Sequence, residues 1–208
     1  MRSTCDGRAR RVCDVVGAVA GILVLAPVGL VITISILLTM GRPVLFRQRR
    51  CGRDGREFVI LKFRTLRPPG HADESDRDRQ TWLGAVLRWT SLDELPQLVN
   101  IVRGDMSIIG PRPTLPEQVR HYSTRQRGRL AIRPGLTGWA QVSGRNSLSW
   151  AERIELDLWY IDRRCWRLDL RIVLRTVRVL LWPRGVVGEH GVNPGFGPDQ
   201  DGGVRHAG

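Results

Sequence analysis

The sequence is nearly free of lysine, because Lys62 is the single lysine among 33 basic residues. Its four cysteines have no Cys-x-x-Cys spacing, and its four histidines form no His-Glu-x-x-His pattern. These absences argue against a structural zinc site, whereas a catalytic Mg²⁺ held by carboxylates remains open. The sequence shows no cleavable secretory signal, so the thiols are expected to be reduced and on the cytosolic side of a membrane.

Basic residues outnumber acidic residues by 13 in this chain of 208 residues. The length suits one domain with a core of its own. The charge predicts an anionic partner, which could be nucleic acid, a phosphorylated metabolite or an anionic lipid. Because lysine and arginine bind phosphate differently, the lone lysine in Lys62-Phe63-Arg64-Thr65 favours a phosphate or substrate contact. An edge strand with exposed charges is the alternative.

Residues 15–40 carry no charged side chain. As a helix they would be about 39 Å long, against roughly 30 Å for the hydrocarbon core of a bilayer. Pro27 removes a backbone hydrogen bond near the middle and should kink the helix. Arginines flank both ends, whereas a simple span carries its arginine excess on one side. The pattern favours a segment that enters one leaflet, bends and returns, over a single span or a buried helix.

Short strands at 44–46 and 58–61 are expected to form a hairpin around a turn at 52–55. Helices are expected at 82–89, 91–102 and 150–160. In 163–182, arginines recur every three or four residues opposite a row of apolar side chains, with tryptophans near both ends. This pattern is typical of a basic amphipathic helix at a membrane surface, and a core helix with a solvated arginine face is the alternative. The expected fold class is α+β and mainly helical.

Asp93-Glu94 is an adjacent acid pair at the expected start of the helix 91–102. Taken alone, Ser91-x-x-Glu94 fits a capping box, which is a structural role. The surroundings favour chemistry instead. Arg88 lies about one turn earlier, and Arg112 stands between two prolines, which suits an arginine that binds phosphate. One carboxylate could then attack phosphorus while the other holds Mg²⁺.

The chain resembles the bacterial sugar transferase family, the monotopic phosphoglycosyl transferases, over roughly residues 8–186. Two departures are Ala26 before Pro27, where the family often has serine, and Leu66, where it usually has methionine. The block 91–113 is highly specific for the family. The motifs are 41–48 (GRPVLFRQ), 62–65 (KFRT), 90–98 (TSLDELPQL), 104–107 (GDMS), 110–113 (GPRP), 133–138 (RPGLTG) and 143–145 (SGR).

The resemblance implies transfer of a sugar 1-phosphate from a UDP-sugar to undecaprenyl phosphate at the cytoplasmic face of the membrane, with release of UMP. This reaction begins the assembly of a surface polysaccharide or glycan. Carried over from the family, Asp93 is the nucleophile, and Glu94 helps Asp93 to bind Mg²⁺. From the resemblance and the basic elements together, the residues expected to bind substrate phosphates are Lys62, Arg64, Arg88, Arg112 and Arg145.

The family's membrane segment is re-entrant, in agreement with the interpretation of Pro27 as its kink. We therefore expect a basic N-terminus and a re-entrant helix-hairpin at 1–43, a compact cytosolic catalytic domain with interfacial amphipathic helices at 44–187, and a disordered tail at 188–208. Membrane lipids are expected partners, nucleic acid is not, and a homodimer is compatible with the sequence. The alternatives are a non-enzymatic basic protein that binds membrane or nucleic acid, and an adaptor that kept the fold without activity. The sequence does not name the sugar.

Overall fold

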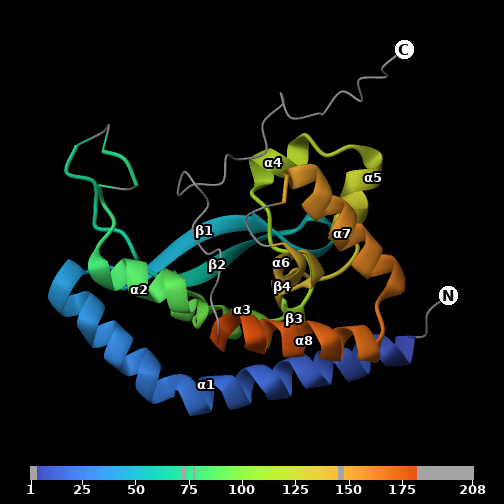
Figure 1. Ribbon diagram of the computed structural model, residues 1–208, viewed down its shortest axis with the longest axis horizontal. Coiled ribbons are helices and arrows are strands. Elements are labelled where there is room, and N and C mark those ends of the chain that lie inside the picture. Colours follow the sequence, from blue (N-terminus) through green and yellow to red (C-terminus); the bar gives the residue numbers. More distant parts are fainter. Residues whose placement is uncertain (1–3, 72–73, 77, 145–147, 182–208) are drawn as a thin grey trace.

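The computed structural model describes residues 4–71, 74–76, 78–144 and 148–181, so the expected tail at 188–208 lies outside the described residues. Over these residues the protein is mainly helical with two small sheets (Figure 1), which confirms the expected class. The sheets are an antiparallel hairpin of β1 (Leu45–Cys51) with β2 (Glu57–Phe63), and a parallel pair of β3 (Ser107–Ile109) with β4 (Gly135–Thr137). The α-helices are α1 (Thr4–Met40), α2 (Trp82–Thr90), α3 (Gln97–Arg103), α4 (Pro116–Arg120), α5 (Thr124–Arg127), α6 (Trp139–Ser143), α7 (Trp150–Arg163) and α8 (Trp166–Leu181).

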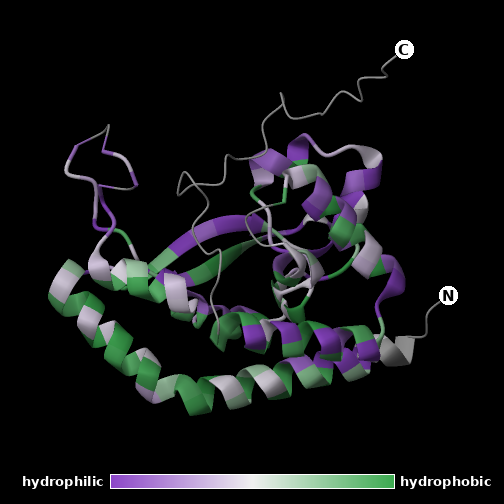
Figure 2. Cartoon of the chain, in the orientation of Figure 1, coloured by the Kyte–Doolittle hydropathy of each residue, from purple (hydrophilic) through white to green (hydrophobic). Residues whose placement is uncertain are grey.

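Helix α1 runs along one side of the molecule and bends partway (Figure 1). Pro27 lies inside it and cannot donate a hydrogen bond to the preceding turn, which allows the helix to bend. The structure shows one bent helix and not two separate ones, so the expected hairpin is not confirmed. From Gly7 to Met40 the helix is long and apolar enough to cross a membrane (Figure 2). Only 11% of its most apolar part is buried in the molecule.

Both halves of α1 nevertheless pack against the rest of the chain. In the first half, Ala18 joins a buried cluster with Ile60 of β2 and Ile101 of α3. In the second half, Ile32 and Ile36 pack in a cluster that contains Phe63 and Leu87. The helix therefore contributes to the same core as the residues that follow position 43.

Buried polar groups fix the first half of α1 in register. The carboxylate of Asp14 accepts hydrogen bonds from the Ser107 hydroxyl at 2.7 Å and from the Ile108 amide at 2.9 Å. Arg11 donates to the last carbonyls of α3, at Ile101 and Val102. Arg10 pairs with Asp169 of α8. Because unpaired polar groups are costly in a core, these partners specify where the helix docks.

The predicted hairpin is confirmed, with Leu45 opposite Phe63 and Cys51 opposite Glu57. Its tip is a short 3₁₀ turn, η1 (Arg53–Gly55), in which Asp54 and Gly55 both have positive φ angles of 57° and 76°. Such angles favour glycine and tolerate aspartate, which explains the Arg-Asp-Gly tip.

The predicted helix at 91–102 is wrong at its start. Helix α2 ends at Thr90, Ser91 adopts a left-handed conformation with φ 61°, and α3 begins only at Gln97. The acid pair lies between them in a 3₁₀ turn, η2 (Leu92–Glu94), and Ser91 makes no capping hydrogen bond there. The reason is Pro96, which lacks an N–H and is tolerated at the beginning of a helix but not deep inside one.

The predicted helices at 82–89 and 150–160 are confirmed as α2 and α7. A stack of side chains joins α7 to α6 and α8. The stacked rings of Trp139 and Trp159 lie 5.3 Å apart, with Arg163 5.2 Å from the Trp159 ring and Arg175 4.7 Å from the Trp139 ring. Such alternation of cations and rings is favourable and ties the three helices together.

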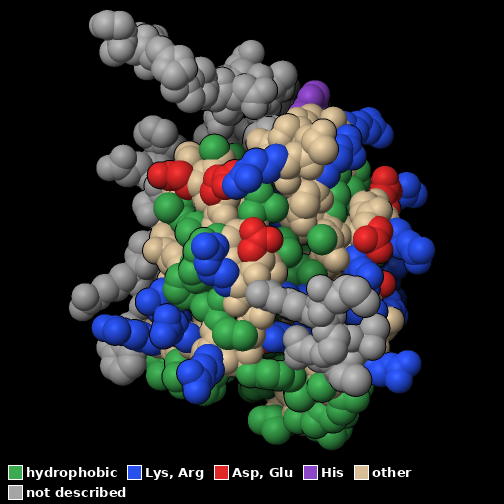
Figure 3. All heavy atoms as spheres, turned by 90° about the vertical axis from the view of Figure 1, so that its right-hand side faces the viewer, with side chains coloured by type: hydrophobic (Ala, Val, Ile, Leu, Met, Phe, Trp, Pro, Cys, Tyr) green, Lys and Arg blue, Asp and Glu red, His purple; other side chains and the backbone are tan. Residues whose placement is uncertain are grey.

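Helix α8 carries an exposed apolar row, made of Leu170, Val173, Leu174, Val177 and Leu181. Its buried side is short and consists of Leu168, Asp169 and Ile172. Seen from the end of the molecule, hydrophobic side chains gather along the lower edge, with basic side chains above and beside them (Figure 3). An apolar surface of this kind needs a covering in water.

Candidate active site

Three elements that are distant in sequence bring their charged side chains together. The Nζ atom of Lys62, on β2, lies 2.5 Å from Oε1 of Glu94 and 3.8 Å from Oδ2 of Asp93. Nη2 of Arg112, in the loop after β3, contacts the same Oε1 at 3.1 Å. The side chains of Lys62, Asp93 and Glu94 are only 12–19% exposed, and that of Arg112 is 50% exposed. The cluster is therefore a mostly buried acid pair with a mostly buried lysine on one side and the half-exposed guanidinium of Arg112 on the other.

The 3₁₀ turn gives the two acids different surroundings. Burial by itself raises the pKa of Glu94, but Lys62 and Arg112 outweigh it, and the net pKa is about 2. For Asp93 burial dominates over the opposing effect of Lys62, and the repulsion of Glu94 adds to it, so the pKa rises to about 6. Two neighbouring carboxylates with separated pKa values suit two different tasks. Glu94 is held as an anion by fixed cations, whereas Asp93 is the more basic of the pair.

Arg88 reaches this region because α2 approaches the end of β2 closely. A Cβ atom on Gly84 would lie 1.9 Å from the carbonyl oxygen of Thr65, so only glycine permits this contact. One turn later, Nε of Arg88 donates to the hydroxyl of Thr65 at 2.9 Å. From there its charge acts to lower the pKa of Asp93. Arg88 therefore lies close enough to the acid pair to act on Asp93.

The segment that presents Arg112 is held by its backbone. Three successive backbone carbonyls accept hydrogen bonds. Nη2 of Arg129 donates to the carbonyl of Arg112 at 3.1 Å, and Nη1 of Arg50 donates to that of Pro113 at 3.3 Å. The amide of Cys51 donates to the carbonyl of Thr114 at 2.8 Å. With a proline on each side, this segment has little freedom to move. The arginine that meets Glu94 is thereby preorganised.

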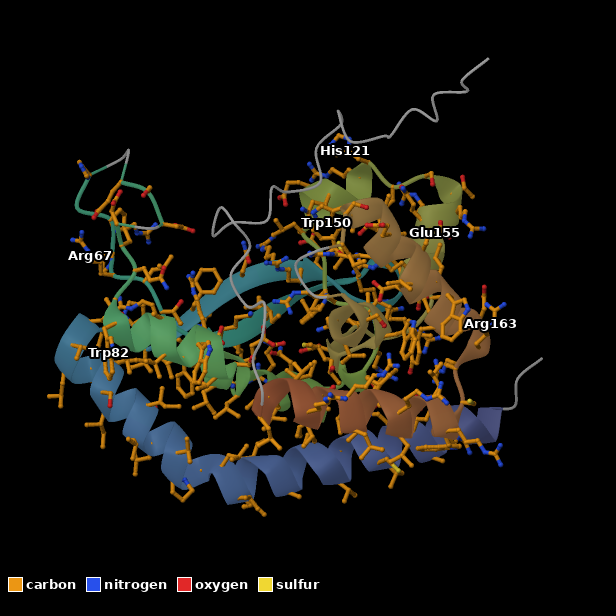
Figure 4. All side chains as sticks on the ribbon, in the orientation of Figure 1. Arg67, Trp82, His121, Trp150, Glu155 and Arg163 are labelled. Atoms are coloured by element: carbon orange, nitrogen blue, oxygen red, sulfur yellow. The ribbon has the colours of Figure 1, made fainter. Side chains whose placement is uncertain are left out.

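Arg129 is itself buried, and each nitrogen of its guanidinium donates a hydrogen bond. Its Nε donates to Asp157 of α7 at 2.6 Å, and Nη1 donates to the hydroxyls of Thr114 and Tyr122 at 2.7 and 2.8 Å. Its guanidinium also lies 5.9 Å from the ring of Trp150, at the start of α7 (Figure 4). This network connects α7 to the segment that carries Arg112.

Arg64 does not join the acid pair. It is buried, and its guanidinium donates to the carbonyls of Met40, Gly41 and Arg42 at the end of α1. A cation at this position satisfies the free carbonyls and complements the helix dipole. Its contacts give no support to the expected role in binding phosphate, and they assign it to anchoring the end of α1.

The remaining sequence-predicted residues lie elsewhere. Arg145 is outside the described residues, so its position relative to the acid pair is not described. Pro27 lies within α1, away from the acid pair in sequence. Sequence reasoning missed Arg50 and Arg129. The signal that could have found Arg50 is the alternation of a strand extended to the Gly52 turn, which would put Arg50 and Gln48 on one face. No local pattern distinguishes Arg129 from its arginine neighbours.

The acid pair offers carboxylate oxygens to a hard cation such as Mg²⁺, but too few to enclose the ion without oxygens from the substrate. Within the described residues, no group of three or more His, Cys, Asp or Glu side chains could enclose a metal ion. Mg²⁺ in phosphoryl-transfer sites commonly uses one or two carboxylates together with substrate phosphates. Lys62 and Arg112 both contact Oε1 of Glu94, and Lys62 also lies 3.8 Å from Oδ2 of Asp93. The oxygens that could face such an ion are therefore Oε2 of Glu94 and Oδ1 of Asp93.

Comparison with known proteins shows the family to which the chain belongs. The model of the bacterial sugar transferase family matches residues 5–183. The "Uncharacterized sugar transferase EpsL" of Bacillus subtilis is 40% identical over 181 residues, which cover 85% of this chain and 89% of that protein. The "Exopolysaccharide production protein ExoY" of Rhizobium meliloti is 38% identical, with 86% and 88% covered. A Caulobacter vibrioides protein named "UDP-glucose:undecaprenyl-phosphate glucose-1-phosphate transferase" is 44% identical, with 83% and 69% covered. The chain is therefore a member of the bacterial sugar transferase family.

Proposed function

We propose that this protein transfers a sugar 1-phosphate from a UDP-sugar to undecaprenyl phosphate and releases UMP. The observation that carries the proposal is the convergence of Lys62 and Arg112 on Glu94, which leaves Asp93 as the more basic acid beside them. The names of the Caulobacter and Rhizobium relatives support the reaction and its place at the start of exopolysaccharide production.

The chemistry divides into two displacements at one phosphorus atom. A carboxylate oxygen of Asp93 attacks the phosphorus that carries the sugar, the bond from that phosphorus to the UMP oxygen breaks, and UMP leaves with the electron pair. An oxygen of undecaprenyl phosphate then attacks the same phosphorus and breaks its bond to Asp93. The carboxylate is restored, and the product is a lipid diphosphate sugar. Splitting the transfer in this way lowers the barrier of each step.

The fixed cations reduce the repulsion between the attacking carboxylate and the substrate phosphates. A carboxylate that approaches a doubly charged pyrophosphate is repelled, and Lys62, Arg88 and Arg112 offset that repulsion where the charge develops. Mg²⁺, held by Asp93 and Glu94 together with substrate oxygens, would further neutralise the phosphate charge. Removal of Mg²⁺ by a chelator is therefore expected to abolish turnover.

We also propose that α1 is re-entrant and lies, with α8, on the cytoplasmic face of the membrane. Support comes from the contacts of both halves of α1 with one folded body, since a straight span would place one end on the far side. The exposed apolar row on α8 and the basic residues around it suit an interfacial helix.

The position of the N-terminus tests this arrangement. A tag at the N-terminus should be accessible to a protease only in inverted vesicles. Cleavage in intact cells would instead indicate a span.

The test of the reaction is UMP release by the full chain in detergent, with Mg²⁺, undecaprenyl phosphate and a panel of UDP-sugars. UMP from one donor, dependent on the acceptor for multiple turnovers, is the expected result and identifies the sugar. Folded protein that releases no UMP from any donor would contradict the proposal. Binding of DNA at physiological salt without UMP release would favour the non-enzymatic alternative.

The raised pKa of Asp93 predicts how the rate depends on pH. Only the ionised carboxylate can attack phosphorus, so kcat/KM for the donor should fall as the pH drops through about 6. One unit below that pKa about a tenth of the sites are ionised, and the rate should be about tenfold lower than its plateau. The measurement is initial UMP release between pH 4.5 and 8 at low donor concentration. A flat profile across this range would argue against Asp93 as the reacting base.

A further inference from the structure

Arg50 faces the site from β1, whereas its neighbour Arg49 points away. The side chain of Arg49 is 79% exposed and lies 3.7 Å from Glu57 across the hairpin. Arg50 is on the opposite face and half-buried, and its Nη1 contacts the Pro113 carbonyl next to Arg112. The alternation of a β-strand thus turns one arginine of the pair outward and the other towards the acid pair.

The hydrogen-bonding capacity of Arg50 is not used up by the protein. Nη2 donates to Oε1 of Gln48 at 2.6 Å, and Nη1 makes the long contact to Pro113 at 3.3 Å. Nε is buried and has no partner, and Arg50 forms no ion pair with any carboxylate in the described part of the chain. A guanidinium has five N–H donors, and a buried donor without a partner is unusual enough to need an explanation.

Charge is also unbalanced around Arg50. Burial first, and the charge of Arg112 second, lower the pKa of Arg50 to about 10, whereas Glu117 and Glu94 act in the opposite direction. Two guanidinium groups held near each other repel, and the carboxylate that Arg112 touches is already shared with Lys62. An anion bound between the two arginines would remove this repulsion and supply acceptors for their open donors.

We propose that Arg50 is a second phosphate-binding arginine of the site and that, with Arg112, it holds the pyrophosphate of the UDP-sugar donor. This inference rests on the proposed function. Two adjacent phosphates match two neighbouring guanidinium forks, each of which can bind phosphate oxygens in a bidentate manner. The bound Pro113 carbonyl keeps Arg50 beside Arg112, and the contact with Glu94 aims Arg112 at the acids.

The first experiment measures UDP binding to the full chain in detergent by isothermal titration. Arg50→Gln is expected to weaken binding about tenfold or more, as the loss of a hydrogen bond to a charged group requires. Arg50→Lys should recover part of the affinity because it restores the charge without the fork. The matched control is Arg49→Gln, which removes the same charge one residue away and should leave the affinity within about twofold. Equal effects at the two positions would overturn the inference.

A double-mutant cycle separates direct contact from an effect transmitted through Arg112. If Arg50 binds phosphate itself, Arg50→Gln should weaken UDP binding further in the Arg112→Gln background. If Arg50 only positions the Pro113 segment, Arg50→Gln should cause no further loss of UDP affinity in the Arg112→Gln background. That result would overturn the inference. Wild-type protein that binds no UDP at all would instead contradict the proposed function, so the two failures are distinguishable.

Discussion

The Asp93→Asn variant is expected to lose turnover by about 10⁴-fold or more, while it remains folded and membrane-associated. The amide has nearly the shape of the carboxylate but cannot attack phosphorus. The substitution also removes one negative charge from a cluster that contains Lys62, Arg88 and Arg112. UDP should therefore bind at least as tightly as to the wild type, and the loss should lie in kcat. UMP release and UDP titration together measure this split.

The matched control is Asp54→Asn at the tip of the hairpin. Asp54 is exposed, pairs only with its neighbour Arg53 in the described structure and has a positive φ that asparagine also tolerates. This variant should turn over normally.

A second measurement detects the covalent intermediate by mass spectrometry. In the wild type without acceptor, the peptide that contains Asp93 should gain the mass of a sugar phosphate. Turnover of Asp93→Asn within tenfold of the wild type would exclude Asp93 as the nucleophile.

The Asp157→Asn variant is expected to cost about 3–5 kcal/mol of folding free energy, because it leaves the buried charge of Arg129 without its partner. The two side chains are only 3% and 2% exposed. For a chain of this size the expected fall in Tm is about 6–20 °C. Thermal unfolding in a fixed detergent, followed by circular dichroism, measures it.

The control for this pair is on the surface of the same helix. Glu155 is labelled on α7 in Figure 4. Glu155→Gln breaks its ion pair with Arg125, in which the two side chains are 54% and 71% exposed, and should change Tm little. Replacing both buried partners, with Arg129→Met and Asp157→Leu, should restore much of the stability. Turnover of that double variant should be lower than that of the wild type, because the carbonyl of Arg112 has lost a donor. A double variant with full activity would show that the network does not position Arg112.

Local patterns in the sequence determined much of the fold. The apolar segment with Pro27 became a bent helix, the strands around the Arg-Asp-Gly tip became the hairpin, and α2 and α7 lie where periodicity predicted them. These features depend on contacts between residues a few positions apart, which composition and spacing describe well. The error at Ser91 was also local, since the left-handed residue and Pro96 together divide one periodic segment into a 3₁₀ turn and a helix.

For the site, the sequence by itself identified the acid pair, the lone lysine and Arg112 as candidates. Only the tertiary structure decided their partners: Lys62 meets Glu94 across 32 positions, Arg64 binds the end of α1, and Arg50 and Arg129 hold the segment that presents Arg112. The physical reason is that a charge finds its partner through strand register and helix packing. Strand register and helix packing depend on the whole core. The sequence alone therefore does not distinguish the few arginines that the fold turns inward from the rest of the 32.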